Sequence, residues 1–149
     1  MAYLLDTNIL VRLANASDTL HAVADQAVVE LHRRGEVLHI TAQNLIEFRN
    51  VATRPTAQNG LGLTGAQAET IALKFEAVFA LLTETSDIYP AWKALVAALV
   101  VIGKQVHDAR LVAVCHVHGA THLLTFNVAD FAPMASFAPG IIVVDPASV

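Results

Sequence analysis

The segment "AYLLDTNILVRLANA", residues 2–16, decides how this chain is expected to fold. It begins with a short apolar run, which is consistent with a buried strand. The acid Asp6 ends that run, and "TNILVRLANA" continues as a short helix. A strand that leads into a helix is the repeating unit of α/β proteins, so the same alternation is expected in the rest of the chain.

Strands and helices are predicted to alternate along the whole chain. Further strands are expected at residues 37–41, 79–84, 121–126 and 140–145. Further helices are expected at residues 18–36, 42–54, 65–79, 86–102 and 104–119, with Thr64 capping the third of these. Strands separated by helices imply parallel βαβ units. The predicted fold is therefore a three-layer α/β/α sandwich around a mainly parallel sheet, formed by one domain that spans residues 1–149.

The composition is unusually apolar, with 55% hydrophobic and 15% charged residues. Such a chain is expected to cover further surface against a partner or a second copy of itself. The formal net charge is −4, which argues against a broad surface that coats nucleic acid. A compact nuclease stays compatible with this charge, because bound cations and a few local arginines can offset the acids and the substrate phosphates.

Three features predict a cytoplasmic protein without a membrane segment. The longest purely apolar run, Ala94 to Ile102, is far shorter than the roughly 20 residues of a membrane span. The start "MAYLLDTN" lacks the basic region of a signal peptide. The only cysteine, Cys115, lies in an apolar helical stretch, which fits a core position in a reducing compartment.

Acidic residues recur where the predicted strands end. Asp6 ends the first strand, Glu47 lies in the helix after the second, Asp108 opens the helix at 104–119, and Asn127 and Asp130 follow the fourth strand. Sites in parallel sheets lie beyond the carboxyl ends of the strands. Carboxylates gathered there repel one another unless a cation lies among them. Mg²⁺ and Mn²⁺ prefer such oxygen ligands, and they activate water against phosphodiesters.

Each acid also has a purely structural interpretation. Asp6 and Asp108 could cap the helices that follow them, where the helix dipole favours a carboxylate. Asp130 could cap a short turn, and Glu47 could lie on a solvated face. Taken together, the acids favour a metal-binding site over separate structural roles. We expect Asp108 both to start its helix and to face the metal.

Four segments of the chain resemble the PIN-domain ribonucleases, and specifically the VapC-type toxins of that family. They are "LLDTNIL", "QNLIEFRNVATRP", "KQVHDARLVAV" and "HLLTFNVADF", whose order and spacing cover almost the whole chain. The resemblance implies an endoribonuclease that depends on Mg²⁺ or Mn²⁺ and leaves 5′-phosphate and 3′-hydroxyl ends. It places the metal-binding and catalytic acids at Asp6, Glu47 and Asp108.

The fourth acidic position of the family is altered in this chain. Many members carry an acid two residues after the threonine of "TFNVADF", where this chain has Asn127. The resemblance implies that Asn127 offers a carbonyl oxygen to the metal or that Asp130 substitutes from one helical turn away. The number of bound metal ions, one or two, stays open. Thr7, Asn8 and Thr125 are expected to orient the carboxylates by hydrogen bonds.

Basic side chains near the predicted site are candidates to hold phosphates of RNA. They are Arg12, Arg49, Arg54, Lys104 and Arg110. The first choice is the pair Arg49 and Arg54, because both share a predicted helix with Glu47. Solvated surface, or ion pairs with acids, is the alternative for each of them.

As a VapC-type toxin, the protein would have a VapB-type antitoxin as partner. The antitoxin would lay a segment across a groove and block the site, and the apolar composition also suits a homodimer. The predicted helices at 65–79 and 86–102 are the candidates for these surfaces, with ordinary core as the alternative.

Two other functions stay open at this point. A phosphotransfer domain could use Asp6 as phosphoacceptor and Lys104 as its partner, although dehalogenase-like phosphatases require an acid where this chain has Asn8, and receiver domains require paired acids near the start. A PIN fold that binds RNA or protein without cutting is favoured by Asn127, whereas the three intact acids oppose it.

Overall fold

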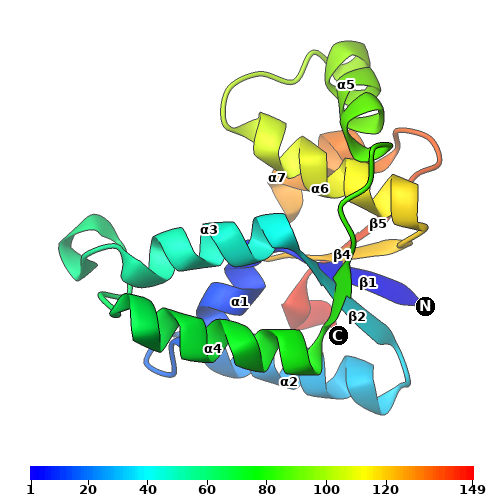
Figure 1. The fold of residues 1–149 in the computed structure, drawn as a ribbon. Helices are drawn as coiled ribbons and strands as arrows, with labels where there is room; N and C mark the ends of the chain where they lie inside the picture. Colours follow the sequence, from blue (N-terminus) through cyan, green and yellow to red (C-terminus); the bar gives the residue numbers. More distant parts are fainter.

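A five-stranded parallel sheet forms the centre of the computed structural model, which describes residues 1–149 (Figure 1). The strands are β1 (Ala2–Leu5), β2 (Val37–Thr41), β3 (Ala80–Leu82), β4 (His122–Leu124) and β5 (Ile142–Val144). Their order is β3-β2-β1-β4-β5, and every neighbouring pair is parallel. The chain therefore moves outward from β1 in both directions, which makes the border between β1 and β4 the switch point of the sheet.

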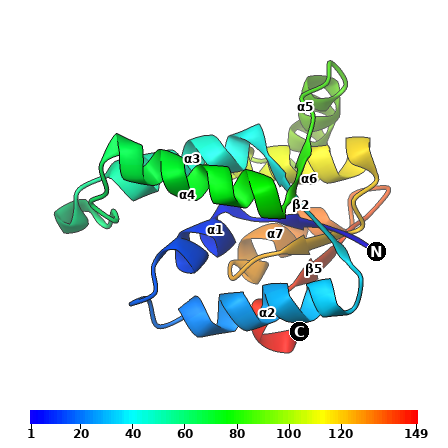
Figure 2. The same ribbon diagram turned by 60° about the horizontal axis from the view of Figure 1, so that its bottom comes forward.

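Helices cover both faces of this sheet. One face carries α1 (Thr7–Ala14), α2 (His21–Arg33), α3 (Ala42–Thr53) and α4 (Gly65–Val78). The other carries α5 (Ile88–Leu99), α6 (Gln105–His118) and α7 (Val128–Ala135), as the two views show (Figures 1 and 2). Short 3₁₀ segments lie at Thr56–Gln58 and Pro146–Ser148. The predicted three-layer sandwich is confirmed.

Strand β1 shows why the composition is so apolar. Tyr3 and Leu5 belong to a core cluster of 14 buried residues, whereas Leu4 belongs to a second cluster of 13 on the opposite face. Successive side chains of a strand point to opposite faces, so a strand between two helical layers must be apolar at every position. A sheet buried on both sides therefore accounts for a large part of the hydrophobic content.

Several predicted boundaries were wrong by a few residues, and one helix was missed. Thr64 caps α4 as predicted, in a capping box with Gln67. Helix α5 ends earlier than predicted, because Val100 adopts a left-handed conformation with φ 52°. Helix α7 was taken for a turn, since it is short and contains Pro133. No helix of the chain has both the length and the apolar character needed to cross a membrane.

Candidate active site

The register of β1 and β4 brings Asp6 and Thr125 side by side. Leu5 pairs with Leu124, so the residues that follow them emerge together at the carboxyl edge of the sheet. The Thr125 hydroxyl donates to Asp6 Oδ2 at 2.7 Å, and the Thr7 backbone N–H donates to Asp6 Oδ1 at 2.7 Å. Asp6 thereby occupies the N-cap of α1 with both carboxylate oxygens bonded.

Thr125 connects this edge to two further polar residues. Besides donating to Asp6, its hydroxyl accepts from Asn8 Nδ2 at 3.2 Å and from the Asn127 backbone N–H at 2.9 Å. A hydroxyl offers one donor and two acceptor positions, and Thr125 uses all three. Thr125 is fully buried. The Asp6 carboxylate is therefore held by a hydroxyl that has little freedom to turn.

Glu47 reaches the same edge from α3. That helix begins directly after β2, in a capping box between Thr41 and Asn44. The Thr7 hydroxyl donates to Glu47 Oε2 at 2.6 Å, and Gln43 Nε2 donates to Glu47 Oε1 at 2.9 Å. Both oxygens of Glu47 thus accept hydrogen bonds, one from the start of α1 and one from the preceding turn of α3.

Asp108 approaches the edge from the first turn of α6, and one expectation about it was wrong. Helix α6 begins at Gln105 with Lys104 in the N-cap position, so Asp108 does not cap its helix. The capping interpretation failed because the helix starts a full turn earlier than the acid. Asp108 is half-buried, and its charge faces those of Asp130 and Glu47.

The acids influence one another's protonation. Burial raises the pKa of Asp6 to about 6, against the hydrogen bond from Thr125, and the charges of Asp108 and Glu47 raise this pKa further. Burial also raises the pKa of Asp108 to about 6, with Asp130 and Glu47 adding to the effect and Lys104 opposing it. Carboxylates drawn from four separate segments therefore form one cluster of mutually repelling charges.

The donor chemistry of this cluster fits a hard divalent cation. It offers carboxylate oxygens, and no lysine or arginine forms an ion pair with Asp6, Glu47 or Asp108. In this structure no three acidic, histidine or cysteine side chains lie close enough together to surround one ion. The acids are thus coupled through their charges without forming a closed ligand shell.

At the fourth acidic position of the family, where this chain has Asn127, the negative charge comes from the nearby Asp130. Asn127 precedes α7 and is exposed, and its backbone N–H donates to Thr125. Asp130 lies in the first turn of α7, is also exposed, and acts on the pKa of Asp108. Electrostatic coupling therefore connects Asp130 to the cluster.

None of the four candidate arginines forms an ion pair with an acid of the cluster. Arg12 forms an ion pair with Asp18, and Arg49 forms one with Glu69 of α4. Arg54 follows the last residue of α3, and its Nε is buried without a hydrogen-bond partner.

The fourth arginine, Arg110, donates to Glu84 Oε2 at 2.5 Å and to Gln43 Oε1 at 3.1 Å. Of the basic residues considered from the sequence, Lys104 is the one whose charge acts on an acid of the cluster, Asp108.

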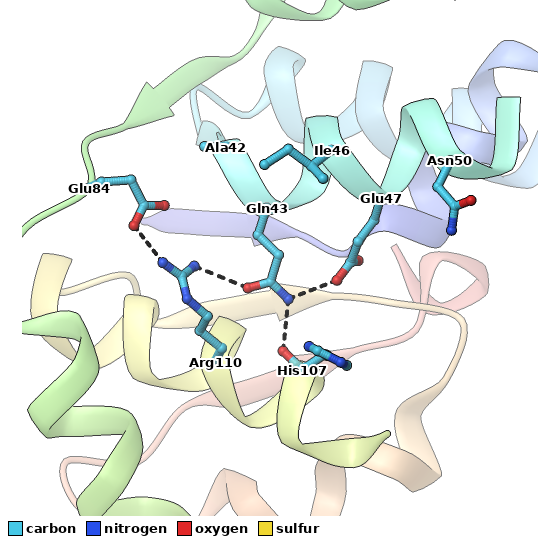
Figure 3. Close-up of a pocket in the computed structure, with 8 residues that line it drawn as sticks. All are labelled: Ala42, Gln43, Ile46, Glu47, Asn50, Glu84, His107 and Arg110. Carbon is cyan, nitrogen blue, oxygen red and sulfur yellow. Dashed lines mark hydrogen bonds and ion pairs between the residues drawn. The ribbon is translucent and has the colours of Figure 1, made fainter. Parts of the chain in front are cut away.

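A cavity beside Glu47 contains residues that the sequence did not reveal as functional. It has a volume of about 590 Å³ and lies between α3 and α6 (Figure 3). Its lining consists of Ala42, Gln43, Ile46, Glu47, Asn50, Glu84, His107 and Arg110. Gln43 lies at the centre of the hydrogen bonds drawn there. The only sequence signal for Gln43 was its position one helical turn before Glu47.

Comparison with known proteins gives a family and a set of structural neighbours. The family model described as "PIN domain" matches residues 3–135. No protein with a curated description matches the sequence significantly.

Three solved structures illustrate the structural likeness. VapBC2 from Rickettsia felis, bound to a DNA fragment from its promoter, has a TM-score of 0.73 and 17% identity, covering 97% of this chain and 98% of that one. A toxin–antitoxin complex from Klebsiella pneumoniae has a TM-score of 0.64 and 24% identity, covering 97% of each chain. VapC20 from Mycobacterium tuberculosis, described as a toxin that cleaves the sarcin–ricin loop, has a TM-score of 0.63 and 21% identity, covering 87% of this chain and 93% of that one.

Proposed function

The chain belongs to the PIN-domain family, and we propose that it is a metal-dependent endoribonuclease that acts as the toxin of a toxin–antitoxin pair. One observation carries the proposal: Asp6, Glu47, Asp108 and Asp130 come from four separate segments and form one charge cluster at the carboxyl edge of the sheet. The likeness to VapC20 supports RNA as the substrate. The proposal takes residues 1–149 as a single PIN domain.

In this proposal Asp6, Glu47 and Asp108 hold Mg²⁺ or Mn²⁺, with Asp130 or Asn127 in the fourth position. When bound, the cation would lower the pKa of a water and stabilise the charge that develops on the phosphodiester. Hydrolysis that breaks the bond between phosphorus and the 3′ oxygen would leave a 3′-hydroxyl and a 5′-phosphate.

The chain's own residues prepare this site. Thr125 and the Thr7 backbone N–H fix both oxygens of Asp6, while the Thr7 hydroxyl orients Glu47. Such supporting hydrogen bonds keep ligands in place. Lys104, at the start of α6, has a charge that acts on Asp108 and is suited to hold a phosphate of the RNA strand.

A VapB-type antitoxin is the proposed partner. A groove of about 410 Å³ between α3 and α4 is lined by Leu45, Ile46, Arg49, Glu69, Ala72 and Glu76. Ile46 is 71% exposed there, which is unusual for a large apolar side chain and suits an antitoxin segment that leads to the acids. The Rickettsia felis and Klebsiella pneumoniae neighbours are toxin–antitoxin assemblies, which supports this kind of partner.

A homodimer is proposed through helix α5 and the turn after it. Tyr89, Val100 and Ile102 expose 64%, 76% and 76% of their surface. Burying such side chains against a second copy would remove apolar area from water. Light scattering of the purified protein, beside a Val100→Asp variant, tests this surface. We expect a dimer that the variant dissociates.

The geometry counts against the phosphotransfer alternative. A phosphoacceptor needs a carboxylate oxygen that is open to the phosphoryl donor. Asp6 is buried, and both of its oxygens already accept hydrogen bonds, from Thr7 and Thr125.

RNA cleavage by purified, antitoxin-free protein tests the proposed activity. The assay compares Mg²⁺, Mn²⁺ and EDTA for the wild type, Asp6→Asn, Asp108→Asn and the control Asp25→Asn, whose acid is exposed on α2. We expect cleavage that needs metal, disappears in the first two variants and survives in the control. Cleavage that persists in Asp6→Asn and Asp108→Asn would contradict the site. No cleavage by folded wild type that still binds metal and RNA would favour the non-cutting module.

A further inference from the structure

Gln43 joins the two helices that carry Glu47 and Asp108. Its side-chain Nε2 donates to Glu47 Oε1 and to the backbone carbonyl of His107, each at 2.9 Å (Figure 3). The first bond lies within α3, whereas the second crosses to α6. Because Asp108 directly follows His107, one amide group contacts both the Glu47 carboxylate and the backbone next to Asp108.

The orientation of the Gln43 amide is fixed by its neighbours. Its Oε1 accepts from Arg110 Nη1 at 3.1 Å, and Arg110 Nη2 also donates to Glu84 Oε2 at 2.5 Å. A flipped amide would place its oxygen against the Glu47 carboxylate and the His107 carbonyl, and its NH₂ against the Arg110 guanidinium. Every one of these contacts would join like to like, so only the observed orientation satisfies all the groups.

The position of Glu47 depends on its hydrogen bond from Gln43, whereas the position of Asp6 does not depend on any residue of the cavity. Asp6 is held by the backbone N–H of Thr7 and by the fully bonded hydroxyl of Thr125. Glu47 is a longer side chain, and its Oε1 has Gln43 as its donor. Without the amide, Glu47 Oε1 loses its donor, the whole carboxylate is held only by the Thr7 hydroxyl at Oε2, and the link to α6 at His107 is lost.

We propose that Gln43 is a positioning residue for the acid cluster: its amide bridges α3 and α6 and sets the placement of Glu47 relative to Asp108. Arg110 and Glu84 hold the amide in its working orientation. The inference rests on the proposed metal-dependent nuclease and assigns Gln43 no contact with substrate. It predicts that loss of the amide weakens metal binding and slows the chemical step, while binding of RNA is unchanged.

The test compares Gln43→Met and Gln43→Ala with Asn50→Ala. Methionine is close to glutamine in length, so it keeps the packing and removes only the amide. Asn50 is a matched control, because it lies on the same helix and the same cavity wall but makes no hydrogen bond to the other residues drawn (Figure 3). Mn²⁺ affinity is measured by calorimetric titration, kcat and KM by RNA cleavage, and folding by circular dichroism.

We expect both Gln43 variants to lose about 10-fold to 100-fold in Mn²⁺ affinity and in kcat, the usual range for partners that orient ligands, with KM unchanged. Asn50→Ala should match the wild type. Wild-type affinity and kcat in Gln43→Met would overturn the inference, and so would a change confined to KM, which would mean substrate contact. If the wild type itself binds no Mn²⁺, both the proposed function and the inference about Gln43 are wrong. If the wild type and the Gln43 variants bind Mn²⁺ equally, only the inference about Gln43 is wrong.

Discussion

The strand edge around Asp6 and the helical cleft around Glu47 and Asp108 are held together in different ways. Asp6 and Thr125 meet because Leu5 pairs with Leu124 in the sheet, and one bond to Asp6 comes from backbone N–H. Glu47 and Asp108 stand on separate helices, which the side chain of Gln43 connects. Backbone register fixes the first half of the site, whereas side-chain hydrogen bonds adjust the second. Substitutions at the edge should therefore act on both stability and activity, and those in the cleft mainly on activity.

Removing the charge at Asp6 should have the largest effect on cleavage. Asp6→Asn is expected to lower the rate by more than about 100-fold, beyond the range for residues that only support a ligand. The fold should survive, because the amide oxygen still accepts from the Thr7 N–H. Single-turnover RNA cleavage measures the loss, with Asp25→Asn as the control. A rate within tenfold of wild type would remove Asp6 from the site.

Replacing Thr125 should cost the most stability. Thr125→Val keeps the shape but leaves Asp6, Asn8 and the Asn127 N–H without their partner. Asp6 is buried, so leaving its oxygen unpaired should lower the free energy of unfolding by about 1–3 kcal/mol, and the half-buried Asn8 and the exposed Asn127 should add less. Urea unfolding measures it. Thr83→Val, at an exposed position, is the matched control. An equal loss in both variants would contradict the role of Thr125 at the strand edge.

The burial of Asp6, together with the repulsion from Asp108 and Glu47, should make the stability of the metal-free protein depend on pH. The pKa of Asp6 is about 6 in the folded state and near 3.8 when unfolded, so between these values the folded state binds the proton more strongly. Asp6 therefore contributes stability at low pH that is lost as the pH rises from about 4 to about 6.

Asp6→Asn should lack this decline, so relative to wild type it gains up to about 3 kcal/mol between pH 4 and pH 7.5. Asp108→Asn should change in the same direction by less, because solvent screens its half-buried carboxylate. Thermal unfolding of both variants and the wild type in EDTA measures the difference. A gap that stays constant with pH would contradict the raised pKa of Asp6.

Lys104 should have the smallest effect, and only on substrate binding. Lys104→Gln is expected to raise KM about fivefold, equivalent to about 1 kcal/mol, with kcat unchanged and a difference that shrinks in high salt. Arg49→Ala should leave both constants as they are, because Arg49 is paired with Glu69 on the surface. A larger KM change in Arg49→Ala than in Lys104→Gln would restore the interpretation drawn from the sequence alone.

The strand edge was predictable from the sequence because its geometry follows from the backbone. An apolar run that ends in Asp6, and a second predicted strand at residues 121–126, are enough to place the ends of both strands at one edge of a parallel sheet. The cleft was less predictable. The start of α6 at Gln105 left Asp108 one turn inside its helix, and the ion pair between Arg49 and Glu69 depends on how α4 packs against α3. Neither feature leaves a local signal in the sequence.

Helix α7 and Gln43 illustrate the same limit. Pro133 is a helix breaker in most contexts, yet α7 forms around it with Phe131 and Met134 buried in the core. Gln43 reads as an ordinary polar helix residue until His107 and Arg110 are brought beside it from a distant part of the chain. Burial and long-range packing decided both cases.

Calorimetric titration of Mn²⁺ into the wild type, Asp6→Asn and Asp108→Asn at pH 7.5 tests the central claim most directly. If the strand edge and the helical cleft form one metal site, the wild type binds Mn²⁺ saturably, and each substitution weakens binding by more than about tenfold, while Asp25→Asn does not. Equal Mn²⁺ binding by the wild type and Asp6→Asn would show that the two halves do not share a cation, and the account of the site would be wrong.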